Sequence, residues 1–301
     1  FIEQNSTSNN YSDKKSWSIL SNIEHRIKEK IEKIGVPLQD WNNQIYYGIK
    51  TGLNEAFIIS GDKKNELIHK DPKSAEIIRP ILRGRDIKRY GYQFADLYVI
   101  CTFPSRNYDI EDFPAIKNHL LTFGYERLEQ SGKSYIVNGE RISARKKTNN
   151  KWFETQDSIS YWDDFSKQKI MYPNMTKYLP FYLDDKGFFQ NDKSFFITGP
   201  NLSFLCAFLN SSLFKYCFIN NFPELQGGTR ELRKIFFDKI PVIQLQDSKN
   251  QIFSEFVDEI QRKKEKGKDT EEIEREIDDQ IFKLYNLNDE ERQAIGYIKI
   301  L

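Results

Sequence analysis

The feature that most constrains the fold is a change of hydrophobic pattern along the chain. Between Ile45 and Ile243 the apolar residues form short segments rich in Ile, Tyr and Phe, separated by Gly, Pro, Asn and Asp. Such segments are typical of β-strands joined by turns. Outside this stretch the apolar residues recur every three or four positions, which is typical of amphipathic helices. The sequence therefore predicts an α+β protein, a mixed and strand-rich domain with flanking N- and C-terminal helices.

Both ends of the chain carry helix signals. In residues 13–35 apolar side chains recur at spacings of three and four, Ser12 can cap the start, and Gly35 ends the pattern. Residues 249–264 show a second apolar face, and a further helix opens at Asp269 with acidic residues in its first turn. We expect these last two helices to pack as an antiparallel hairpin, on each other or against the N-terminal helix.

Three parts are expected along the chain. Residues 1–44 are interpreted as the leading linker of a fragment followed by a helix, residues 45–245 as the strand-rich domain, and residues 246–301 as a helical hairpin tail. Within the strand-rich part, residues 115–130 and 202–219 have helical patterns. The second is apolar on much of its surface, so we expect it to be largely buried.

The composition excludes several classes of protein. Hydrophobic residues make up 39% and charged residues 30% of the chain, and no apolar run reaches the roughly 18 residues of a membrane helix. The start of the chain lacks the features of a secretory signal. Cys101, Cys206 and Cys217 have neither a disulfide nor a zinc-binding pattern. We therefore expect a globular protein of the reducing cytoplasm, without a membrane partner.

Charge is distributed unevenly along the chain. The formal net charge is +1, but residues 257–292 contain 13 Asp and Glu against 8 Lys and Arg. The part before this tail is therefore mildly basic, which permits phosphate binding. The acidic tail leaves another interpretation open, a protein-interaction or scaffold module that works through its acidic helices.

A glycine turn follows the first apolar strand. The segment GIKTG, from Gly48 to Gly52, places Lys50 and Thr51 between two glycines. Glycine lets the backbone turn sharply, so that both side chains and exposed amides are presented on one side. This arrangement suits a phosphate or a base edge, and an ordinary glycine turn is the alternative.

A second turn is densely basic. In ILRGRDIKRY, from Ile81 to Tyr90, four cations surround Gly84 with a single acid, Asp86. Such a loop attracts phosphates, and the planar fork of arginine can also bind guanine. Alternatively, Asp86 pairs with an arginine and fixes the loop. The candidate DNA-binding residues here are Arg83, Arg85, Lys88 and Arg89.

The most basic stretch without internal acids is RISARKKTNNKW, residues 141–152. Its cations suit the DNA backbone, its amides can pair with adenine, and Trp152 can stack, so we expect base readout here. Tyr90 is the next aromatic candidate for the DNA face. A solvated surface loop is the competing interpretation. The candidate residues are Arg141, Arg145, Lys146, Lys147, Asn149, Asn150, Lys151 and Trp152.

Two later segments complete the set. QGGTRELRK, residues 226–234, pairs a flexible glycine turn with a helix start, where Thr229 and Arg230 can hold a phosphate. Glu231 can instead neutralise Arg230 on a surface helix. LNSSL, residues 209–213, lies in an apolar stretch, and we expect its role to be structural.

In this order and spacing the four segments GIKTG, ILRGRDIKRY, LNSSL and QGGTRELRK resemble the TaqI-like C-terminal specificity domain, from about Ile45 to Val242. This is the target-recognition domain of adenine-specific DNA methyltransferases and of single-chain type II restriction-modification enzymes. The resemblance implies sequence-specific recognition of double-stranded DNA in a bacterial enzyme. It also implies a methyltransferase domain before Phe1, which would bind S-adenosylmethionine and methylate a flipped adenine. The insertion near Arg141 departs from the family pattern, so contacts there are not carried over.

Catalytic patterns are missing from these 301 residues. There is no Asn-Pro-Pro-aromatic loop, no glycine-rich cofactor turn and no Pro-Asp of a metal-dependent nuclease. The three histidines are isolated from one another and from the cysteines. We expect no catalytic residue, no metal and no cofactor in this chain, although a hydrolase that uses scattered carboxylates stays open as a further alternative.

Overall fold

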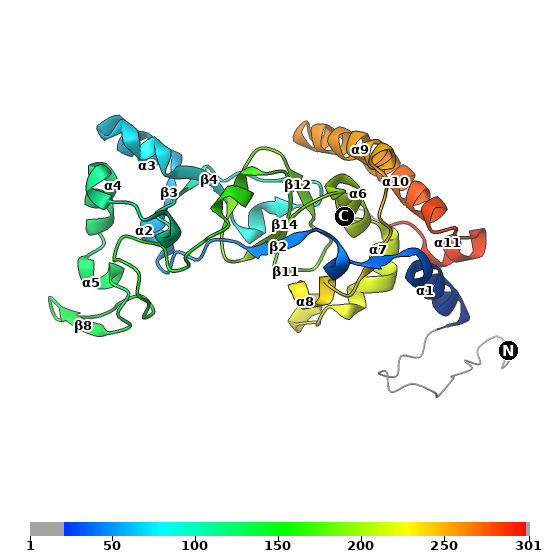
Figure 1. Ribbon diagram of the computed structural model, residues 1–301, viewed down its shortest axis with the longest axis horizontal. Coiled ribbons are helices and arrows are strands. Elements are labelled where there is room, and N and C mark those ends of the chain that lie inside the picture. Colours follow the sequence, from blue (N-terminus) through cyan, green and yellow to red (C-terminus); the bar gives the residue numbers. More distant parts are fainter. Residues whose placement is uncertain (1–20, 299–301) are drawn as a thin grey trace.

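The computed structural model describes residues 21–298. A four-stranded antiparallel sheet lies near the middle of this elongated molecule (Figure 1). Its strand order is β12 (Tyr182–Asp184), β10 (Lys169–Pro173), β14 (Ser194–Thr198) and β2 (Gln44–Tyr47). Every residue of β10 and β14 is buried. Both faces of the sheet are therefore covered by other parts of the chain.

Side chains of the central sheet alternate between two hydrophobic clusters. Ile170 and Tyr172 belong to the cluster on the helical side, whereas Met171 between them belongs to the cluster on the other face. On β14, Phe195 and Phe196 divide in the same way. This is the period of two expected for a strand, and it explains why these strands are apolar throughout.

The second sheet lies toward the opposite end from the terminal helices (Figure 1). Its order is β13 (Phe189–Gln190), β4 (Ile78–Leu82), β7 (Leu97–Ile100) and β3 (Ile58–Ser60), with only the β13–β4 pair parallel. A third hydrophobic cluster joins this sheet to the helices of that end. These are α2 (Asn54–Phe57), α3 (Gly61–Lys70), α4 (Pro114–Leu121) and α5 (Tyr125–Leu128).

The other end of the molecule is helical (Figure 1). All residues of α6 (Leu202–Leu209) are buried, and α6 packs against α9 (Asp247–Glu265). One hydrophobic cluster contains residues from these helices and from the other helices of this end. They are α1 (Asn22–Ile34), α7 (Ser212–Phe218), α10 (Glu271–Leu284) and α11 (Asp289–Ile295).

Small two-stranded pairs complete the described fold. They are β1 (Val36–Pro37) with β16 (Pro241–Val242), β5 (Ile87–Lys88) with β6 (Gly91–Tyr92), β8 (Ser134–Val137) with β9 (Glu140–Ser143), and β11 (Met175–Thr176) with β15 (Arg230–Glu231). The short helix α8 (Lys234–Phe237) follows β15. The mixture of helices and sheets confirms the predicted α+β class. The division into three parts stays a prediction, and the largest hydrophobic cluster contains residues from all three.

The helix boundaries differ from the prediction in three places. Helix α1 begins at Asn22, because Ser21 has extended backbone angles and forms a reciprocal capping box with Glu24; Ser12 lies outside the described residues. The helix predicted over residues 115–130 is divided at Gly124, whose φ of +87° a right-handed helix does not allow. The helix predicted over residues 202–219 is bent by 65° between α6 and α7.

That bend coincides with LNSSL. The Asn210 side chain donates to the carbonyl of Phe181 at 2.8 Å, and Ser211 caps α7 by accepting from Phe214 N at 3.1 Å. The structural role expected for this segment is confirmed, at a helix break rather than inside one helix. Within residues 21–298 no single helix is long and apolar enough to span a membrane, although the bent α6–α7 pair together has sufficient length and apolar composition.

Candidate nucleic-acid interface

The turn formed by residues 190–194 holds the two glycine segments together. The backbone nitrogens of Gly48 and Ile49 donate to Ser194 O and Gln190 O at 3.0 and 2.7 Å. On the other side, Gly84 N donates to the side-chain oxygen of Asn191 at 3.2 Å. The two glycine segments therefore meet at a turn that follows them by more than 100 residues in the sequence.

Gly48 and Gly84 allow the backbone of residues 190–193 to approach closely. A Cβ atom on Gly48 would lie 2.0 Å from the carbonyl oxygen of Asn191, and one on Gly84 would lie 2.4 Å from that of Lys193. Neither distance is possible for a real side chain, so both positions require glycine. The sharp turn expected of GIKTG depends instead on Gly52, which has a φ of +79°.

The two candidate side chains of GIKTG have different surroundings. Lys50 is exposed. Thr51 is 1% exposed, and its hydroxyl donates to Asn54 Oδ1 at 2.7 Å and accepts from Leu53 N. The Thr51 side chain is therefore buried and engaged in the turn itself, which argues against the predicted contact with DNA.

Two of the four cations in ILRGRDIKRY are paired inside the protein. Arg83 donates twice to Asp86, at 2.8 and 2.9 Å. Burial alone would raise the pKa of Asp86, but these bonds outweigh it and hold the pKa below its ordinary value. The alternative that Asp86 fixes the loop is thus correct for Arg83. Tyr90 is 1% exposed and is not on a DNA face.

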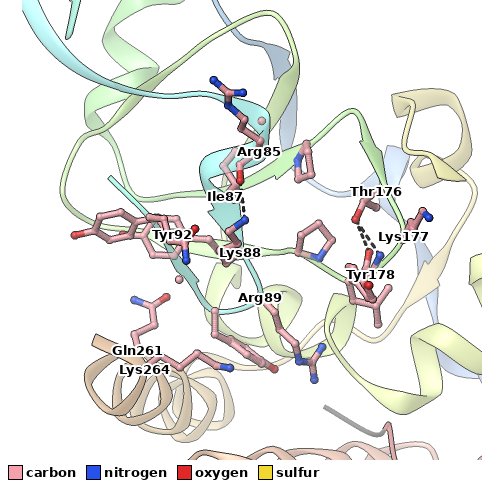
Figure 2. A pocket seen from close by; sticks show the side chains of 18 of the residues that line it. Arg85, Ile87, Lys88, Arg89, Tyr92, Thr176, Lys177, Tyr178, Gln261 and Lys264 are labelled. Carbon is pink, nitrogen blue, oxygen red and sulfur yellow. Dashed lines mark hydrogen bonds between the residues drawn. The ribbon is translucent and has the colours of Figure 1, made fainter. Parts of the chain in front are cut away.

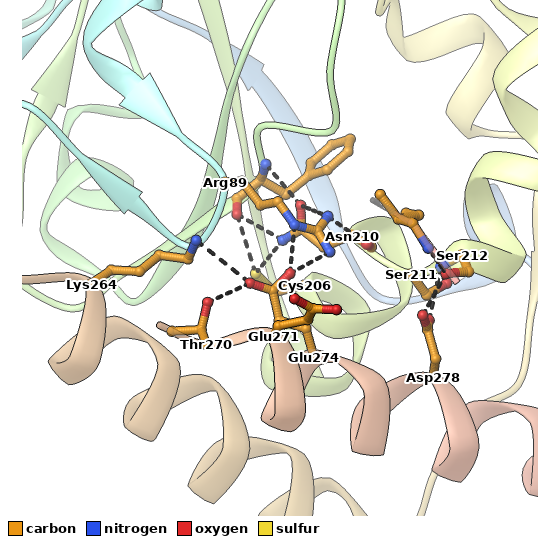
Figure 3. Close-up of polar contacts among 12 residues, drawn as sticks. Arg89, Cys206, Asn210, Ser211, Ser212, Lys264, Thr270, Glu271, Glu274 and Asp278 are labelled. Carbon is orange, nitrogen blue, oxygen red and sulfur yellow. Dashed lines mark hydrogen bonds and ion pairs between the residues drawn. The ribbon is translucent and has the colours of Figure 1, made fainter. Parts of the chain in front are cut away.

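Arg89 connects the basic loop to the C-terminal hairpin. Its guanidinium lies 2.6 Å from Glu274 on α10 and also donates to the carbonyl of Asn210 (Figure 3). Glu274 in turn accepts from Thr270 and lies 3.5 Å from Lys264 (Figure 3). Both guanidinium groups are therefore already paired inside the protein, and DNA contact by Arg83 and Arg89 stays a prediction.

Arg85 and Lys88 are exposed and line a groove of about 1080 Å³ (Figure 2). Residues 84–93 form one side of it, residues 173–182 another, and α7 and α9 contribute from the helical end. Within this lining the only carboxylate is Glu265, which is paired with Lys186. We call this surface the basic groove. Its cations are Arg85, Lys88, Arg89, Lys177, Lys215 and Lys264.

Three of these cations were missed by sequence reasoning. Lys177 and Lys215 are isolated cations in separate segments, and Lys264 lies in the basic run RKKEKGK at the end of a predicted helix. No local signal distinguishes them from ordinary surface lysines. They become part of one surface only because β11, α7 and α9 converge on the 84–93 loop.

Arg145 lies inside the protein. It is 4% exposed, and its guanidinium donates to the backbone carbonyls of Leu128, Thr51, Glu154 and Trp152 at 2.6–2.9 Å. Burial lowers its pKa to about 10. Arg145 joins the 141–152 segment to GIKTG, and its burial argues against the predicted contact with DNA.

The other candidate residues of the 141–152 segment differ in their surroundings. Both amide hydrogens of Asn150 are donated, to Thr155 O at 3.1 Å and Gln156 O at 2.9 Å, so it is not available for a bidentate pair with adenine. Trp152 is half-buried and packs against the ring of Phe153. DNA contact stays a prediction for the exposed residues of the segment, which form no ion pair within the described part of the chain. They are Arg141, Lys146, Lys147, Asn149 and Lys151.

In QGGTRELRK, Arg230 is also paired, although not with Glu231. It lies 2.6 Å from Glu224 and donates to the carbonyl of Phe222 at 3.0 Å. It therefore fixes the base of the glycine turn and is not free to hold a phosphate. Thr229 is half-buried, and contact by its side chain stays a prediction.

Comparison with known proteins identifies the class. Residues 79–242 match the TaqI-like C-terminal specificity domain, and the chain belongs to this family. It is 26% identical over 296 residues to the type II methyltransferase M.MjaIV of Methanocaldococcus jannaschii, covering 91% of this chain and 87% of that protein. DNA target recognition in a restriction-modification context is therefore the general function of the chain.

Two solved structures are similar. The type IIL restriction-modification enzyme MmeI, determined in complex with DNA, has a TM-score of 0.56 and 13% identity, covering 85% of this chain and 34% of MmeI. The type IIG restriction endonuclease BpuSI has a TM-score of 0.48 and 14% identity, covering 79% of this chain and 28% of BpuSI. The chain thus spans about a third of these enzymes, and the likeness to MmeI is one of fold.

Other functions receive less support. Among the described side chains, no group of three His, Cys, Asp or Glu residues is placed to hold a metal ion. The apolar faces of α9 and α10 are packed in the core of this chain through residues such as Val257 and Ile277. The family and this packing do not favour a scaffold that works through its acidic helices.

Proposed function

We propose that the chain is the sequence-specific double-stranded DNA recognition module of an adenine-specific DNA methyltransferase, or of a restriction enzyme fused to one. The observation that carries the proposal is the basic groove. Its cations come from four separate segments, and its one carboxylate is neutralised by a lysine. An arrangement of this kind attracts the phosphates of nucleic acid and fixes the orientation of a duplex.

Within this proposal the paired arginines support the surface that binds DNA. Arg83 and Arg230 hold the loops at 84–89 and 223–229, whereas Arg85, Lys88 and Lys177 present free charges toward the groove. Exposed lysines and arginines that neutralise phosphates release counterions, so affinity should fall steeply as salt rises. Lys50 and the exposed cations of residues 141–151 extend this function along the same chain.

Methylation belongs, in this proposal, to a catalytic domain outside these 301 residues. The family and the lack of an Asn-Pro-Pro-aromatic loop and of a glycine-rich cofactor turn support this assignment, whereas the similar methyltransferase M.MjaIV, covered over 87% of its length, does not. A phosphate-bearing or nucleoside cofactor commonly binds at an open glycine turn before a helix. Here the turns at Gly48 and Gly84 are filled by the backbone of residues 190–193, so they do not fit S-adenosylmethionine. The chain contributes binding, orientation and readout of the duplex.

Duplex binding and its salt dependence test the proposal. We expect the chain to bind a labelled duplex, and replacement of Lys88, Lys177 and Lys215 by alanine to lower the slope of log affinity against log salt by about 3. The matched control replaces Lys28, Lys63 and Lys70, which are paired on α1 and α3 outside the groove, and should leave the slope nearly unchanged. Failure of the wild-type chain to bind duplex DNA at low salt would overturn the proposal.

A further inference from the structure

We propose that the ribbon formed by β11 and β15, together with the turn at residues 223–229, reads base edges in the DNA, and that the side-chain amide of Gln226 determines specificity. This inference rests on the proposed function and adds to it the element and the group that select the sequence. Sequence reasoning placed base readout in residues 141–152, where the Asn150 amide is already engaged.

The ribbon is a separate two-stranded unit. Met175 pairs with Glu231 and Thr176 pairs with Arg230, and no further strand is joined to this pair within the described residues. Immediately before β15 the chain forms a tight turn, in which Leu225 N donates to Thr229 O at 2.6 Å. The major groove of B-DNA is wide enough to admit a two-stranded ribbon.

The base of the turn is rigid. Arg230 contacts Glu224, the carbonyl of Phe222 and the side chain of Asn220, and thereby connects the two sides of the turn. The ribbon itself is attached to the core by Asn174, whose backbone nitrogen donates to Lys193 O at 3.0 Å. A recognition loop held in this way needs little ordering when it binds.

The tip of the turn is free. Gln226, Gly227 and Gly228 are exposed, and the Gln226 side chain forms no hydrogen bond in the part of the chain that the structure describes. Gly227 and Gly228 have φ values of +73° and +77°, so this path favours glycine. They also add no bulk beside the amide. A glutamine amide can donate to N7 and accept from N6 of adenine, which no other base presents in this pattern.

Large apolar side chains of the ribbon and of its adjoining segments are exposed. Tyr178 is 64% exposed, Met175 49% and Leu225 39%, although side chains of this kind are normally buried. Thr176 orders the loop before Tyr178, since its hydroxyl accepts from Tyr178 N at 3.0 Å (Figure 2). Apolar groups beside an amide suit a major groove, where the thymine methyl group lies next to the edge of adenine.

The ribbon is continuous with the basic groove. Met175, Lys177 and Tyr178 line the groove, and Lys177 Nζ lies 3.7 Å from the position of a Cβ atom on Gly227. The turn that carries Gln226 therefore lies beside one of the cations of the basic groove. DNA bound by its backbone in the groove would place a base edge at the turn.

Selection from a randomised duplex pool tests the inference. The wild-type chain should enrich a motif, and Gln226→Ala should weaken binding to that motif by about 5- to 150-fold while binding to the unselected pool stays within about twofold. Gln226→Glu should shift the preference at the same position from adenine toward cytosine, because a carboxylate accepts from cytosine N4. Gln244→Ala, at another exposed glutamine, is the matched control and should enrich the wild-type motif.

The outcomes separate the two proposals. Enrichment of the wild-type motif by both Gln226 variants, with unchanged affinity, would overturn the role of the ribbon and leave DNA recognition intact. Binding without any enriched motif by the wild-type chain would overturn sequence-specific recognition itself. If the Gln226→Glu variant selects a different base at one position of the motif, this result supports base readout by the ribbon. A merely structural defect lowers affinity without selecting a different base.

Discussion

The side-chain oxygen of Asn191 accepts a hydrogen bond from the backbone nitrogen of Gly84 at 3.2 Å, and also one from Lys193 N at 3.3 Å. The same turn receives the backbone of Gly48 from the other side. One buried asparagine thus helps to fix the relative position of two segments that carry exposed cations, Lys50 and Arg85. This geometry makes the glycines the most sensitive positions of the interface.

Alanine at Gly48 or Gly84 should therefore destabilise the fold. The added Cβ atom would meet a backbone carbonyl oxygen at 2.0 or 2.4 Å, and relief of such a contact requires backbone movement. We expect a loss of about 1–3 kcal/mol or more in the free energy of unfolding, measured by urea denaturation. Gly91→Ala is the control, since a Cβ atom there meets nothing within 4 Å. Equal stability of all three variants would contradict this account.

The strands of the core could be predicted from the sequence, whereas the helix break at Asn210 could not. SFFIT and IYYGI lie in β14 and β2, because β-branched and aromatic residues between turn signals suit a buried strand. The break at Asn210 was hidden, because the segments before Asn210 and after Ser212 are apolar and the Asn210 amide finds its partner at Phe181, just before β12. The local sequence pattern gives no information on a partner so distant in the sequence.

The same limit applies to charge. The sequence correctly located a dense basic loop at residues 81–90, but it gave no means to tell Arg85, which is free, from Arg89, which pairs with a glutamate 185 residues later. In residues 141–152, Arg145 and Lys146 are adjacent cations, yet one is buried and the other exposed. Which cation faces inward is decided by tertiary contacts.

Replacement of Arg145 should test its role as a structural connector. Arg145→Ala leaves the carbonyls of Leu128, Thr51 and Trp152 without the side chain that binds them, whereas that of Glu154 still accepts from Gln130 Nε2 at 3.0 Å. We expect a loss of about 2–4 kcal/mol in the free energy of unfolding. Arg145→Lys should not restore stability, because one ammonium group lacks the planar fork that reaches carbonyls on several segments. Thermal or urea denaturation measures both. Lys146→Ala, at the exposed neighbour, should be close to wild type, and a similar loss there would argue against the connector role.

A buried ion pair joins two strands of the central sheet. Lys169 on β10 and Asp184 on β12 are both 0% exposed and in direct contact. Lys169→Met leaves a carboxylate buried without its partner, and we expect a loss of about 3–5 kcal/mol. The double variant Lys169→Met with Asp184→Asn should regain part of this stability, because the amide is neutral and its one oxygen still accepts from one of the two backbone nitrogens, of Lys186 and Phe188, that bind the carboxylate. A double-mutant cycle by urea denaturation measures the coupling, and strictly additive losses would contradict it.

Asp278 should give the fold a specific pH dependence. This carboxylate on α10 is 5% exposed and accepts from the backbone and hydroxyl of Ser212 (Figure 3), and burial raises its pKa to about 6 despite those bonds. Because the folded state binds the proton more tightly than the unfolded state, this group contributes stability below pH 4 that is lost as pH rises toward 6.

Comparison with Asp278→Asn isolates that contribution, since the amide does not titrate. The stability of the wild type relative to the variant should fall by at most about 3 kcal/mol between pH 4 and pH 7 and stay constant above that range. Urea denaturation at a series of pH values provides the measurement. A relative stability that instead rises with pH would mean that the hydrogen bonds from Ser212, together with the nearby Arg89 guanidinium, outweigh burial and keep the carboxylate charged.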